Sequence, residues 1–436
     1  MKRPARNLLA ALAVLGSALV FAPPGSAASS LPRASSSPVG WVNAWQASPV
    51  PGGTIPGSNC PADTGLNNQT VRNIAFTTAG GDRVRVRLTN AFGAQPLRVG
   101  AASVAIAGPG SAAVPGSTRA LRFGGRSSIV IAADAEALSD PVSLKINALQ
   151  RLDISIYLPT ATGPATQHFF AQQDNYLASG NQTGAPSAAA FTTTITCRMF
   201  VDDVDVQASP RVAGTVVTLG DSITDGFGST TNANRRYPDD LATRLNAVHG
   251  RTLSVSNAGI GGNDLLTFRT DVPFGPIFGP PAVARLPRDV LTQAGAQSVI
   301  LLEGINDIGA SGGQADDLIQ ADQQIIAQAH AAGLRVYGAT LTPFGGSNGQ
   351  YGGQYGTPEG EAQRHLLNHW IRTSGAFDAV FDFDKAIRDP SDPTRMLPQY
   401  DSGDHLHPSD AGYQKMADTV NLAVLLRGIS VPHHRS

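Results

Sequence analysis

The stretch Val216–Thr230 reads VVTLGDSITDGFGST and changes character in its middle. Its first part is an apolar, β-branched run of the kind that forms a strand buried on both faces. The run ends abruptly at Gly220, Asp221 and Ser222, and a stretch rich in glycine and serine follows. A serine at the end of a buried strand can be a turn residue, a helix cap or a nucleophile, so the rest of the sequence has to decide.

From about Val212 to the C-terminus, similar apolar runs alternate with helical patterns. The further apolar runs are TLSVSNAG, SVILLEGIND, LRVYGATLTPF and DAVFDFD. Four segments between and after them have helical periodicity: YPDDLATRLNAVHG, ADDLIQADQQIIAQAHAAG, TPEGEAQRHLLNHWIRTSG and SDAGYQKMADTVNLAVLL. Strands that alternate with helices form right-handed βαβ units. We therefore expect an α/β domain with a doubly wound parallel sheet over residues 209–430.

From about Trp41 to Val206 the apolar residues alternate with period two instead. The run DRVRVRLTN places Val84, Val86 and Leu88 on one face, and RLDISIYLP, TVRNIAFTT, SSIVIAA and FTTTITCRMF resemble further strands. Short alternating strands without helices between them are typical of an antiparallel β-sandwich. We expect this domain over residues 41–208, with Trp41 and Trp45 in its core.

The N-terminus has the pattern of a secretory signal peptide. Basic residues at 2, 3 and 6 precede an apolar run at 8–21, and PPGSAASS follows it. The run is short for a membrane span, so a leader cleaved near Ala27 or Ala28 is preferred to a membrane anchor. This predicts an extracellular or periplasmic protein without stable membrane insertion. The expected segments are a signal peptide at 1–28, a linker at 29–40, the two domains, and a tail at 431–436.

Composition and cysteine content restrict the partners. Charged residues make up 15% of the chain, the formal net charge is −1, and neither a basic stripe nor an acidic tail is present. This argues against nucleic acid as a partner. The two cysteines, Cys60 and Cys197, can form one disulfide or remain two free thiols. Export favours the disulfide, which would contribute about 4–5 kcal/mol by loop-closure entropy.

Chemically useful residues follow the apolar runs of the C-terminal half. Because the carboxyl ends of parallel strands meet at one edge of a sheet, we expect their loops to lie together. The candidates on these loops are Ser222, Gly259, Gly261, Gly262, Asn306, Asp404 and His407.

These residues are the parts needed for acyl transfer. His407 can accept the proton of the Ser222 hydroxyl, and Asp404 can orient the imidazole. The N–H groups of Ser222 and Gly262 and the Asn306 amide can stabilise an oxyanion. Each residue alone also has a plain structural explanation as a helix cap, turn or surface loop.

Four of these segments resemble the ordered blocks of the GDSL esterases and lipases, also called SGNH hydrolases. GDSIT is similar to the first block, NAGIGGN to the second, GIND to the third and DHLHP to the fifth. The resemblance covers Val212–Leu426 and implies a flavodoxin-like three-layer α/β/α fold, an acyl-enzyme mechanism and no cofactor. It also implies that Ser222 is the nucleophile, that His407 and Asp404 complete the triad, and that Gly262 and Asn306 complete the oxyanion hole.

The sandwich is similar, less specifically, to the N-terminal part of longer secreted members of this family. Within the second block, the resemblance implies Gly262 and not Gly259 or Gly261, because Gly262 lies five residues after Asn257, where the family's second-block glycine falls. GDSIT does not match the Gly-x-Ser-x-Gly elbow of α/β-hydrolases, and no dinucleotide motif is present.

Several other motifs have competing explanations. The pair His405 and His407 suggests a metal site but lacks further ligands, so we expect no metal. The helical set Glu361, His365 and His369 is interpreted as a polar helix face. Two inserted loops could shape the substrate pocket or simply pack: the first carries Phe268, Phe274, Ile277 and Phe278, and the second carries Tyr351 and Tyr355. For the second loop, a flexible glycine-rich surface loop is favoured over stacking on a sugar or aryl ring.

The sequence therefore predicts a secreted serine esterase for short acyl or acetyl esters, acting on a small molecule or a polysaccharide. A carbohydrate acetylesterase and an acyltransferase remain alternatives. A lipase and a catalytically dead binding module are less favoured, and the sequence leaves the oligomeric state open.

Overall fold

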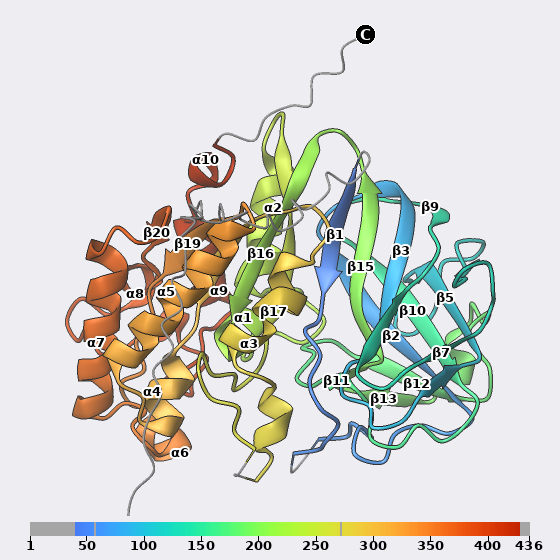
Figure 1. The fold of residues 1–436 in the computed structure, drawn as a ribbon, viewed down its shortest axis with the longest axis horizontal. Helices are drawn as coiled ribbons and strands as arrows, with labels where there is room; N and C mark the ends of the chain where they lie inside the picture. The colour runs from blue at the N-terminus through green and yellow to red at the C-terminus, as the bar shows by residue number, and fades with distance from the viewer. Residues whose placement is uncertain (1–39, 56–57, 271–272, 428–436) are drawn as a thin grey trace, which may run out of the picture. The chain divides into compact units, whose positions relative to one another are not determined.

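The computed structural model describes residues 40–55, 58–270 and 273–427 (Figure 1). The predicted signal peptide at 1–28, the linker up to residue 39 and the tail at 431–436 lie outside the described residues. Within the described ranges, no helix combines the length and apolar character needed to cross a membrane.

Residues 41–208, which we call the β-region, form two main antiparallel sheets. The first contains β1 (Trp41–Gln46), β15 (Val201–Ala208), β3 (Gly81–Asn90) and β8 (Ala135–Leu138), and β9 (Val142–Ile146) also pairs with β3. The second runs in the order β13 (Thr193–Ile195), β12 (Asn175–Ser179), β2 (Gln69–Thr77), β10 (Gln150–Leu158), β5 (Ala101–Ile106) and β6 (Arg119–Ala120). Two small sheets pair β11 (Gln167–His168) with β14 (Arg198–Met199), and β4 (Leu97–Val99) with β7 (Ile129–Ile131).

The period-two pattern of the β-region is confirmed. Val84, Val86 and Leu88 are fully buried in a core shared by both main sheets. On the opposite face of β3, Arg85 and Arg87 form ion pairs with carboxylates of β15. The predicted strand at 191–200 is instead divided into β13 and β14, and these two strands belong to different sheets.

A disulfide joins Cys60 and Cys197, whose Cα atoms lie 5.7 Å apart. This confirms the first of the two possibilities that the sequence left open. Both cysteines are buried, and Cys197 directly precedes β14. Trp45 is also buried in the core of the β-region, as expected. The same prediction is wrong for Trp41, which is only partly buried and lies under the Arg85 guanidinium at 4.5 Å.

Residues 212–425, which we call the α/β region, form a parallel sheet. Its order is β17 (Thr252–Gly259), β16 (Val212–Gly220), β18 (Ala296–Leu302), β19 (Arg335–Ala339) and β20 (Ala379–Phe381). In chain order this is 2-1-3-4-5, the flavodoxin-like arrangement, so the predicted fold class is confirmed.

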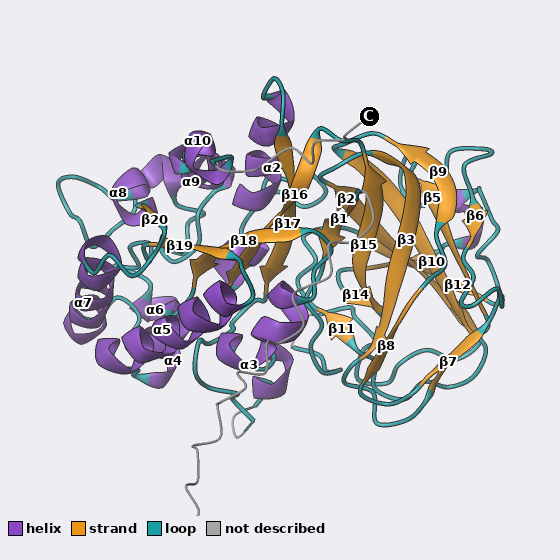
Figure 2. Ribbon diagram, turned by 45° about the horizontal axis from the view of Figure 1, so that its top comes forward, coloured by secondary structure: helices purple, strands orange, loops and turns teal. Residues whose placement is uncertain are grey.

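Helices cover both faces of the parallel sheet (Figure 2). One layer contains α2 (Tyr237–Ala247), α8 (Phe383–Ile387), α9 (Asp410–Thr419) and α10 (Leu422–Leu425). The other contains α3 (Ala282–Leu286), α4 (Ile305–Ser311), α5 (Ala315–Ala331), α6 (Asn348–Tyr351) and α7 (Pro358–Thr373). The single turn α1 (Ser222–Asp225) follows β16. Short turns of 3-10 helix lie at Ala188–Ala190, Gly275–Phe278 and Pro398–Tyr400, and a π-helical turn lies at Pro287–Leu291.

The helix boundaries follow local sequence signals. The Thr357 hydroxyl accepts a hydrogen bond from Gly360 N–H, and Pro358 occupies the first turn of α7, where its missing N–H costs nothing. The predicted continuous C-terminal helix is wrong in one respect. The Asn421 side chain accepts hydrogen bonds from the next turn and begins a separate helix, α10, after α9 has ended.

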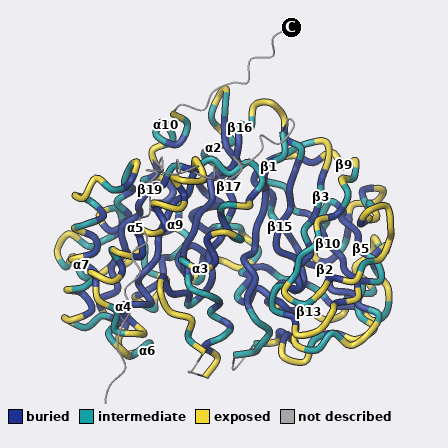
Figure 3. The backbone as a smooth tube through the Cα atoms, viewed as in Figure 1, coloured by how far each residue is buried: buried dark blue, intermediate teal, exposed yellow. Residues whose placement is uncertain are grey.

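The edge strand β17 of the parallel sheet is covered by the β-region. The Thr78 hydroxyl donates to Val255 O at 2.8 Å and accepts from Val255 N–H at 3.1 Å. Beside it, Asn43 N–H donates to Ala294 O at 2.8 Å. The central strands of both regions are largely buried (Figure 3), and the described residues belong to one compact unit. An edge strand that would otherwise expose free N–H and C=O groups is thereby protected.

Candidate active site

Ser222 is the first residue of α1, directly after the end of β16. The Asp221 carboxylate caps this turn by accepting a hydrogen bond from Ile223 N–H at 2.8 Å. In the sheet, Gly220 pairs with Gly259 of β17 and with Leu302 of β18. The loops that carry Ser222, Gly262 and Asn306 therefore leave three neighbouring strands at the same level, as the sequence predicted.

The candidate nucleophile, base and orienting residue form one hydrogen-bonded chain. Ser222 Oγ lies 2.8 Å from His407 Nε2, and His407 Nδ1 lies 2.7 Å from Asp404 Oδ2. With Nδ1–H donating to the carboxylate, Nε2 is free to accept the serine proton. Only 6% of Ser222 and 4% of His407 are exposed, so bulk water hardly competes for these contacts.

The carboxylate of Asp404 accepts more than the imidazole proton. Its Oδ1 atom accepts the backbone N–H groups of Leu406 and His407, at 2.9 and 2.8 Å, and its Oδ2 atom accepts the Tyr351 hydroxyl at 2.9 Å. Burial raises the pKa of Asp404, but the hydrogen bonds and charge of His407 and the backbone donors outweigh it and hold the pKa well below its usual range. Asp404 is consequently ionised beside the imidazole at neutral pH.

Asn306 is held with its amide group in one orientation. The Tyr355 hydroxyl donates to Asn306 Oδ1 at 2.6 Å, and Asn306 Nδ2 donates to Asn263 O at 2.7 Å. Among the described residues, the second N–H of this amide has no acceptor. Since Asn263 directly follows Gly262, the third-block amide lies against the second-block loop.

Gly259 and Gly262 of the second block differ in what their backbone does. Gly259 N–H donates to Asn257 Oδ1 at 2.9 Å and is therefore occupied. Gly262 has φ +71°, and a Cβ atom there would lie 2.4 Å from the Phe278 ring. Within the described part of the chain, Gly262 N–H has no acceptor. The position needs glycine, and its donor is free.

A buried arginine holds the strand ends beneath these loops. Arg285 donates to Gly220 O at 2.9 Å and to Ala258 O at 2.6 Å, and it forms ion pairs with Asp289 and Glu303. It therefore ties β16 to β17 directly below Ser222. The sequence analysis missed this residue because a lone arginine between two prolines has no periodic or motif signal.

Asp221, the residue before the candidate nucleophile, is fully buried. Burial raises its pKa to about 7, although the hydrogen bond from Ile223 opposes the shift. Nearby Asp307 adds to the effect, and the charge of Arg285 reduces it. The cap of α1 is thus a carboxyl group whose ionisation is costly in this environment.

Aromatic rings from both regions surround His407. Phe227 lies 4.5 Å from the imidazole and 5.0 Å from Phe170, and Phe170 in turn lies 4.7 Å from Phe169. The Phe169 ring is also 6.0 Å from Phe278, which packs over Gly262. Phe169 and Phe170 directly follow β11, so the β-region supplies part of the wall of the site.

His168 anchors this aromatic segment to the helix that carries Ser222. Its Nε2 atom lies 3.0 Å from Asp225 Oδ1, and its Nδ1 atom lies 3.0 Å from Ser48 O. Because the Ser48 carbonyl oxygen can only accept, His168 Nδ1–H donates to it. The contact with Asp225 therefore connects α1 to the β-region, one residue before Phe169.

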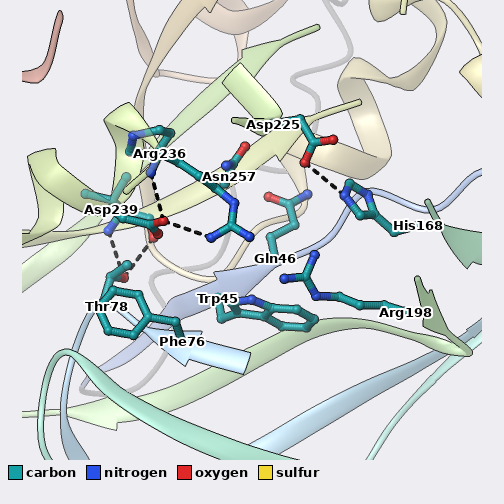
Figure 4. Close-up of a pocket in the computed structure, with 12 residues that line it drawn as sticks. Trp45, Gln46, Phe76, Thr78, His168, Arg198, Asp225, Arg236, Asp239 and Asn257 are labelled. Atoms are coloured by element: carbon teal, nitrogen blue, oxygen red, sulfur yellow. Dashed lines mark hydrogen bonds and ion pairs between the residues drawn. The ribbon is translucent and has the colours of Figure 1, made fainter. Parts of the chain in front are cut away.

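The His168–Asp225 pair lines a small buried cavity of about 30 Å³ (Figure 4). Arg198 and Arg236 also face this cavity, and Arg198 lies over the Trp45 ring at 5.3 Å. Burial, with the neighbouring charge of Arg236, lowers the pKa of Arg198 to about 9. The cavity is enclosed between the two regions, so we regard it as part of their interface.

Other candidates from the sequence lie outside this cluster. His405 bonds Asp401 at 2.6 Å on the protein surface. Glu361 bonds the buried Arg364 at 2.7 Å, while His365 is exposed. In the described ranges, no group of three or more His, Cys, Asp or Glu side chains is arranged to hold a metal. Phe268 and Phe274 are exposed, whereas Ile277 and Phe278 pack with Phe169.

The interpretation of the glycine-rich loop as a flexible surface loop is wrong for Tyr355. Only 6% of this residue is exposed, and its hydroxyl reaches Asn306. Gly309 leaves room for the ring, because a Cβ atom there would lie 2.2 Å from Tyr355 Cδ1. The local sequence around Tyr355 gives no indication of that space, because Gly309 lies far from it in the chain.

Comparison with known proteins identifies the C-terminal part of the chain. The GDSL-like lipase/acylhydrolase family matches residues 218–415. No curated protein sequence matches the chain. The matched segment contains all the residues of the hydrogen-bonded cluster described above.

Three solved structures match parts of this chain at low sequence identity. The aryl esterase of M. smegmatis is 17% identical, with a TM-score of 0.39, and the match covers 50% of this chain and 99% of that one. A GDSL-like lipase from Bacteroides thetaiotaomicron is 18% identical, with a TM-score of 0.36 and coverages of 48% and 87%. A family two carbohydrate esterase from Clostridium thermocellum, in complex with cellohexaose, is 14% identical, with a TM-score of 0.35 and coverages of 83% and 93%.

Proposed function

Residues 218–415 belong to the GDSL-like lipase/acylhydrolase family, and on that premise we propose that the protein is a secreted serine esterase for carboxylic esters with short acyl groups. The observation that carries the proposal is the chain of contacts from Ser222 Oγ through His407 to Asp404, at 2.8 and 2.7 Å. A serine and a base within hydrogen-bond reach, with the base oriented by a third group, are the requirements of nucleophilic catalysis.

In the proposed reaction, Ser222 Oγ attacks the ester carbonyl carbon while its proton passes to His407 Nε2. The resulting oxyanion accepts hydrogen bonds from Ser222 N–H, Gly262 N–H and the free N–H of the Asn306 amide. Collapse of this intermediate expels the alcohol, which takes the proton from His407, and leaves Ser222 acylated. Water then attacks the acyl-enzyme with His407 as base, releasing the carboxylic acid and regenerating Ser222.

The surroundings of Ser222 support a small acyl group. Phe278 packs over Gly262, and Phe169 packs against Phe278, so aromatic bulk lies directly beside the proposed oxyanion site. A long acyl chain would need these rings to move, whereas an acetyl group would not. We therefore expect acetate esters to be better substrates than long-chain esters.

One feature favours a carbohydrate ester as a second candidate. A hollow of about 400 Å³ lies beyond Phe170 and is lined by Ile55, Ser58, Phe170, Gln172, Gln173, Thr196 and Thr231. Phe170 contacts Phe227, which contacts His407, so one lining residue of the hollow is linked to the proposed base through a single ring. An aromatic ring flanked by amides and hydroxyls suits a polyhydroxylated alcohol such as a sugar. A polysaccharide acetylesterase or acyltransferase would use it.

The first experiment compares the mature chain from residue 29 with its Ser222→Ala variant on p-nitrophenyl esters from acetate to a long chain. We expect the highest kcat/KM on acetate and a loss of about a thousandfold or more in the variant. Ser311→Ala, an exposed serine of the same region, is the matched control and should be unchanged. A variant at Ser222 that keeps a tenth of the activity would exclude the mechanism, and a preference for long chains would favour a lipase.

The carbohydrate alternative and export need separate measurements. Release of acetate from an acetylated polysaccharide, at a rate above that on p-nitrophenyl acetate, would favour the second candidate. Transfer of acetyl to an added sugar, instead of to water, would indicate an acyltransferase. N-terminal sequencing of protein recovered outside the cytoplasm should begin after Ala27 or Ala28.

A further inference from the structure

The segment between β19 and α7 approaches the proposed active site at two points. Tyr351 ends α6, and Tyr355 follows four residues later. Their rings are in contact, with centroids 5.7 Å apart. Because one short segment carries both, the two side chains are held relative to each other.

Tyr351 contacts the acid–base pair. Its hydroxyl donates to Asp404 Oδ2 at 2.9 Å and lies 3.4 Å from His407 Nδ1, while its ring stands edge-on to the imidazole at 5.9 Å. The oxygen that accepts the imidazole proton thus has a second donor. Together these contacts restrict rotation of the Asp404 carboxylate and of the His407 ring.

Tyr355 contacts the proposed oxyanion hole. Its hydroxyl donates to Asn306 Oδ1 at 2.6 Å, so the amide cannot flip without losing this bond and the bond from Asn306 Nδ2 to Asn263 O. The ring is buried against Phe344 and against α4, where Gly309 provides the space. Burial raises the pKa of Tyr355, which therefore remains a donor at neutral and mildly alkaline pH.

We propose that Tyr351 and Tyr355 are positioning residues, one for the Asp404–His407 pair and one for the Asn306 amide. The inference rests on the proposed esterase function. It adds that a single segment outside the family's sequence blocks positions both the acid–base pair and the amide of the oxyanion hole. Tyr355 acts through Asn306, which it keeps with its N–H group toward the oxyanion. Tyr351 acts through Asp404, and neither residue exchanges a proton with the substrate.

The test removes each hydroxyl while keeping each ring. Tyr355→Phe should lower kcat about tenfold or more with KM within about twofold, because an oxyanion donor acts in the transition state. Tyr351→Phe should lower kcat by about three- to tenfold through loss of a hydrogen bond to a charged group. Tyr337→Phe, a buried tyrosine of β19 remote from the site, is the matched control and should change kcat by less than about twofold.

Double-mutant cycles separate positioning from a merely structural role. Tyr355→Phe should cause almost no further loss of kcat in an Asn306→Ala background, and Tyr351→Phe almost none in an Asp404→Asn background. Additive losses in either cycle would overturn that assignment, as would full kcat in the single variant. Thermal unfolding of each variant checks that the fold is retained.

A second variant tests Tyr355 without altering its hydroxyl. Gly309→Ala places a methyl group where the Tyr355 ring lies, so it should displace the ring and reduce kcat at unchanged KM. An unchanged kcat in a folded Gly309→Ala protein would contradict the proposal. If wild type and Ser222→Ala do not differ, the esterase function itself has failed; if they differ but the cycles are additive, only the positioning role has failed.

Discussion

Both regions of this protein have a buried apolar core, but they place reactive groups differently. In the α/β region, the strands run parallel, and the residues proposed for chemistry follow their aligned carboxyl ends. In the β-region, antiparallel strands spread their loops over both ends of two sheets, and the segment around His168–Phe170 is one of the few that reach the site. Under the proposed function, the α/β region supplies the reacting groups, while the β-region supplies a wall of the site and covers an edge strand.

The largest effect on activity is expected from a substitution in the α/β region that removes a proposed catalytic group and leaves both cores intact. Asp404→Asn should lower kcat by about 10³–10⁴-fold, because an amide facing Nδ1 no longer fixes the tautomer of His407. The thermal midpoint should stay close to that of wild type. Asp392→Asn, an exposed carboxylate of the same region, should leave kcat unchanged, and comparable losses in both variants would contradict the assignment.

In the β-region, loss of the disulfide should lower stability and leave activity largely unchanged. Replacing Cys60 and Cys197 together by serine should lower the free energy of unfolding by about 2–5 kcal/mol, since the disulfide closes a loop of 137 residues. Urea unfolding followed by fluorescence measures the change. At 25 °C the folded variant should retain kcat within about threefold. A large loss of kcat at unchanged stability would mean that the β-region takes part in the chemistry directly.

The two regions also differ in how buried carboxyl groups respond to pH. In the β-region, burial raises the pKa of Asp153 to about 7, against the opposing charges of Arg72 and Arg151. The folded state therefore holds a proton that the unfolded chain releases near pH 4, so this group's contribution to stability is lost as pH rises from about 4 to 7. The contribution of Asp404 to stability depends on pH in the opposite direction, because folding lowers the pKa of this carboxyl group.

Asp153→Asn should remove part of that pH dependence. One such proton contributes about −1.4 kcal/mol to the free energy of unfolding per pH unit between pH 4 and 7. The variant should therefore lose less stability than wild type over this interval, as measured by urea unfolding at several pH values. Parallel curves for the two proteins would show that Asp153 is already ionised in the folded state at pH 5.

The smallest effect is expected at the wall that the β-region contributes. Phe170→Ala should reduce kcat/KM for esters of bulky or glycosyl alcohols by about three- to tenfold and leave methyl acetate almost unchanged, since only bulky alcohols reach the hollow beyond Phe170. Phe268→Ala, an exposed ring of the α/β region, is the control. Equal losses on large and small alcohols would mean that Phe170 supports His407 and does not select substrates.

Much of the fold was predictable because periodicity reports burial directly. The alternation in β3 and the apolar runs of β16 and β18 identify strands with one and two buried faces, respectively. The boundaries at β13 and α10 were harder, since they depend on which sheet a strand joins and on one capping asparagine.

The candidate site was predictable for the same reason. Parallel strands bring successive loops to one edge, so the order of Ser222, Gly262, Asn306 and His407 in the chain was enough to group them. Motif spacing then separated Gly262 from its neighbours. The structure adds that Gly259 N–H is already bonded to Asn257, while Gly262 N–H is free within the described residues.

Periodicity and motif spacing were enough to predict the two kinds of sheet, one possible pairing of the two cysteines, and the residues at the edge of the parallel sheet. The bond between His168 and Asp225, the position of Phe170 beside the site, and the contacts of Tyr351 and Tyr355 with Asp404 and Asn306 became known from the folded structure. The two sets differ in the sequence separation of the residues that interact. Periodicity and turn chemistry act over a few residues, whereas these contacts join segments dozens of positions apart, whose approach depends on how complete sheets and helices pack.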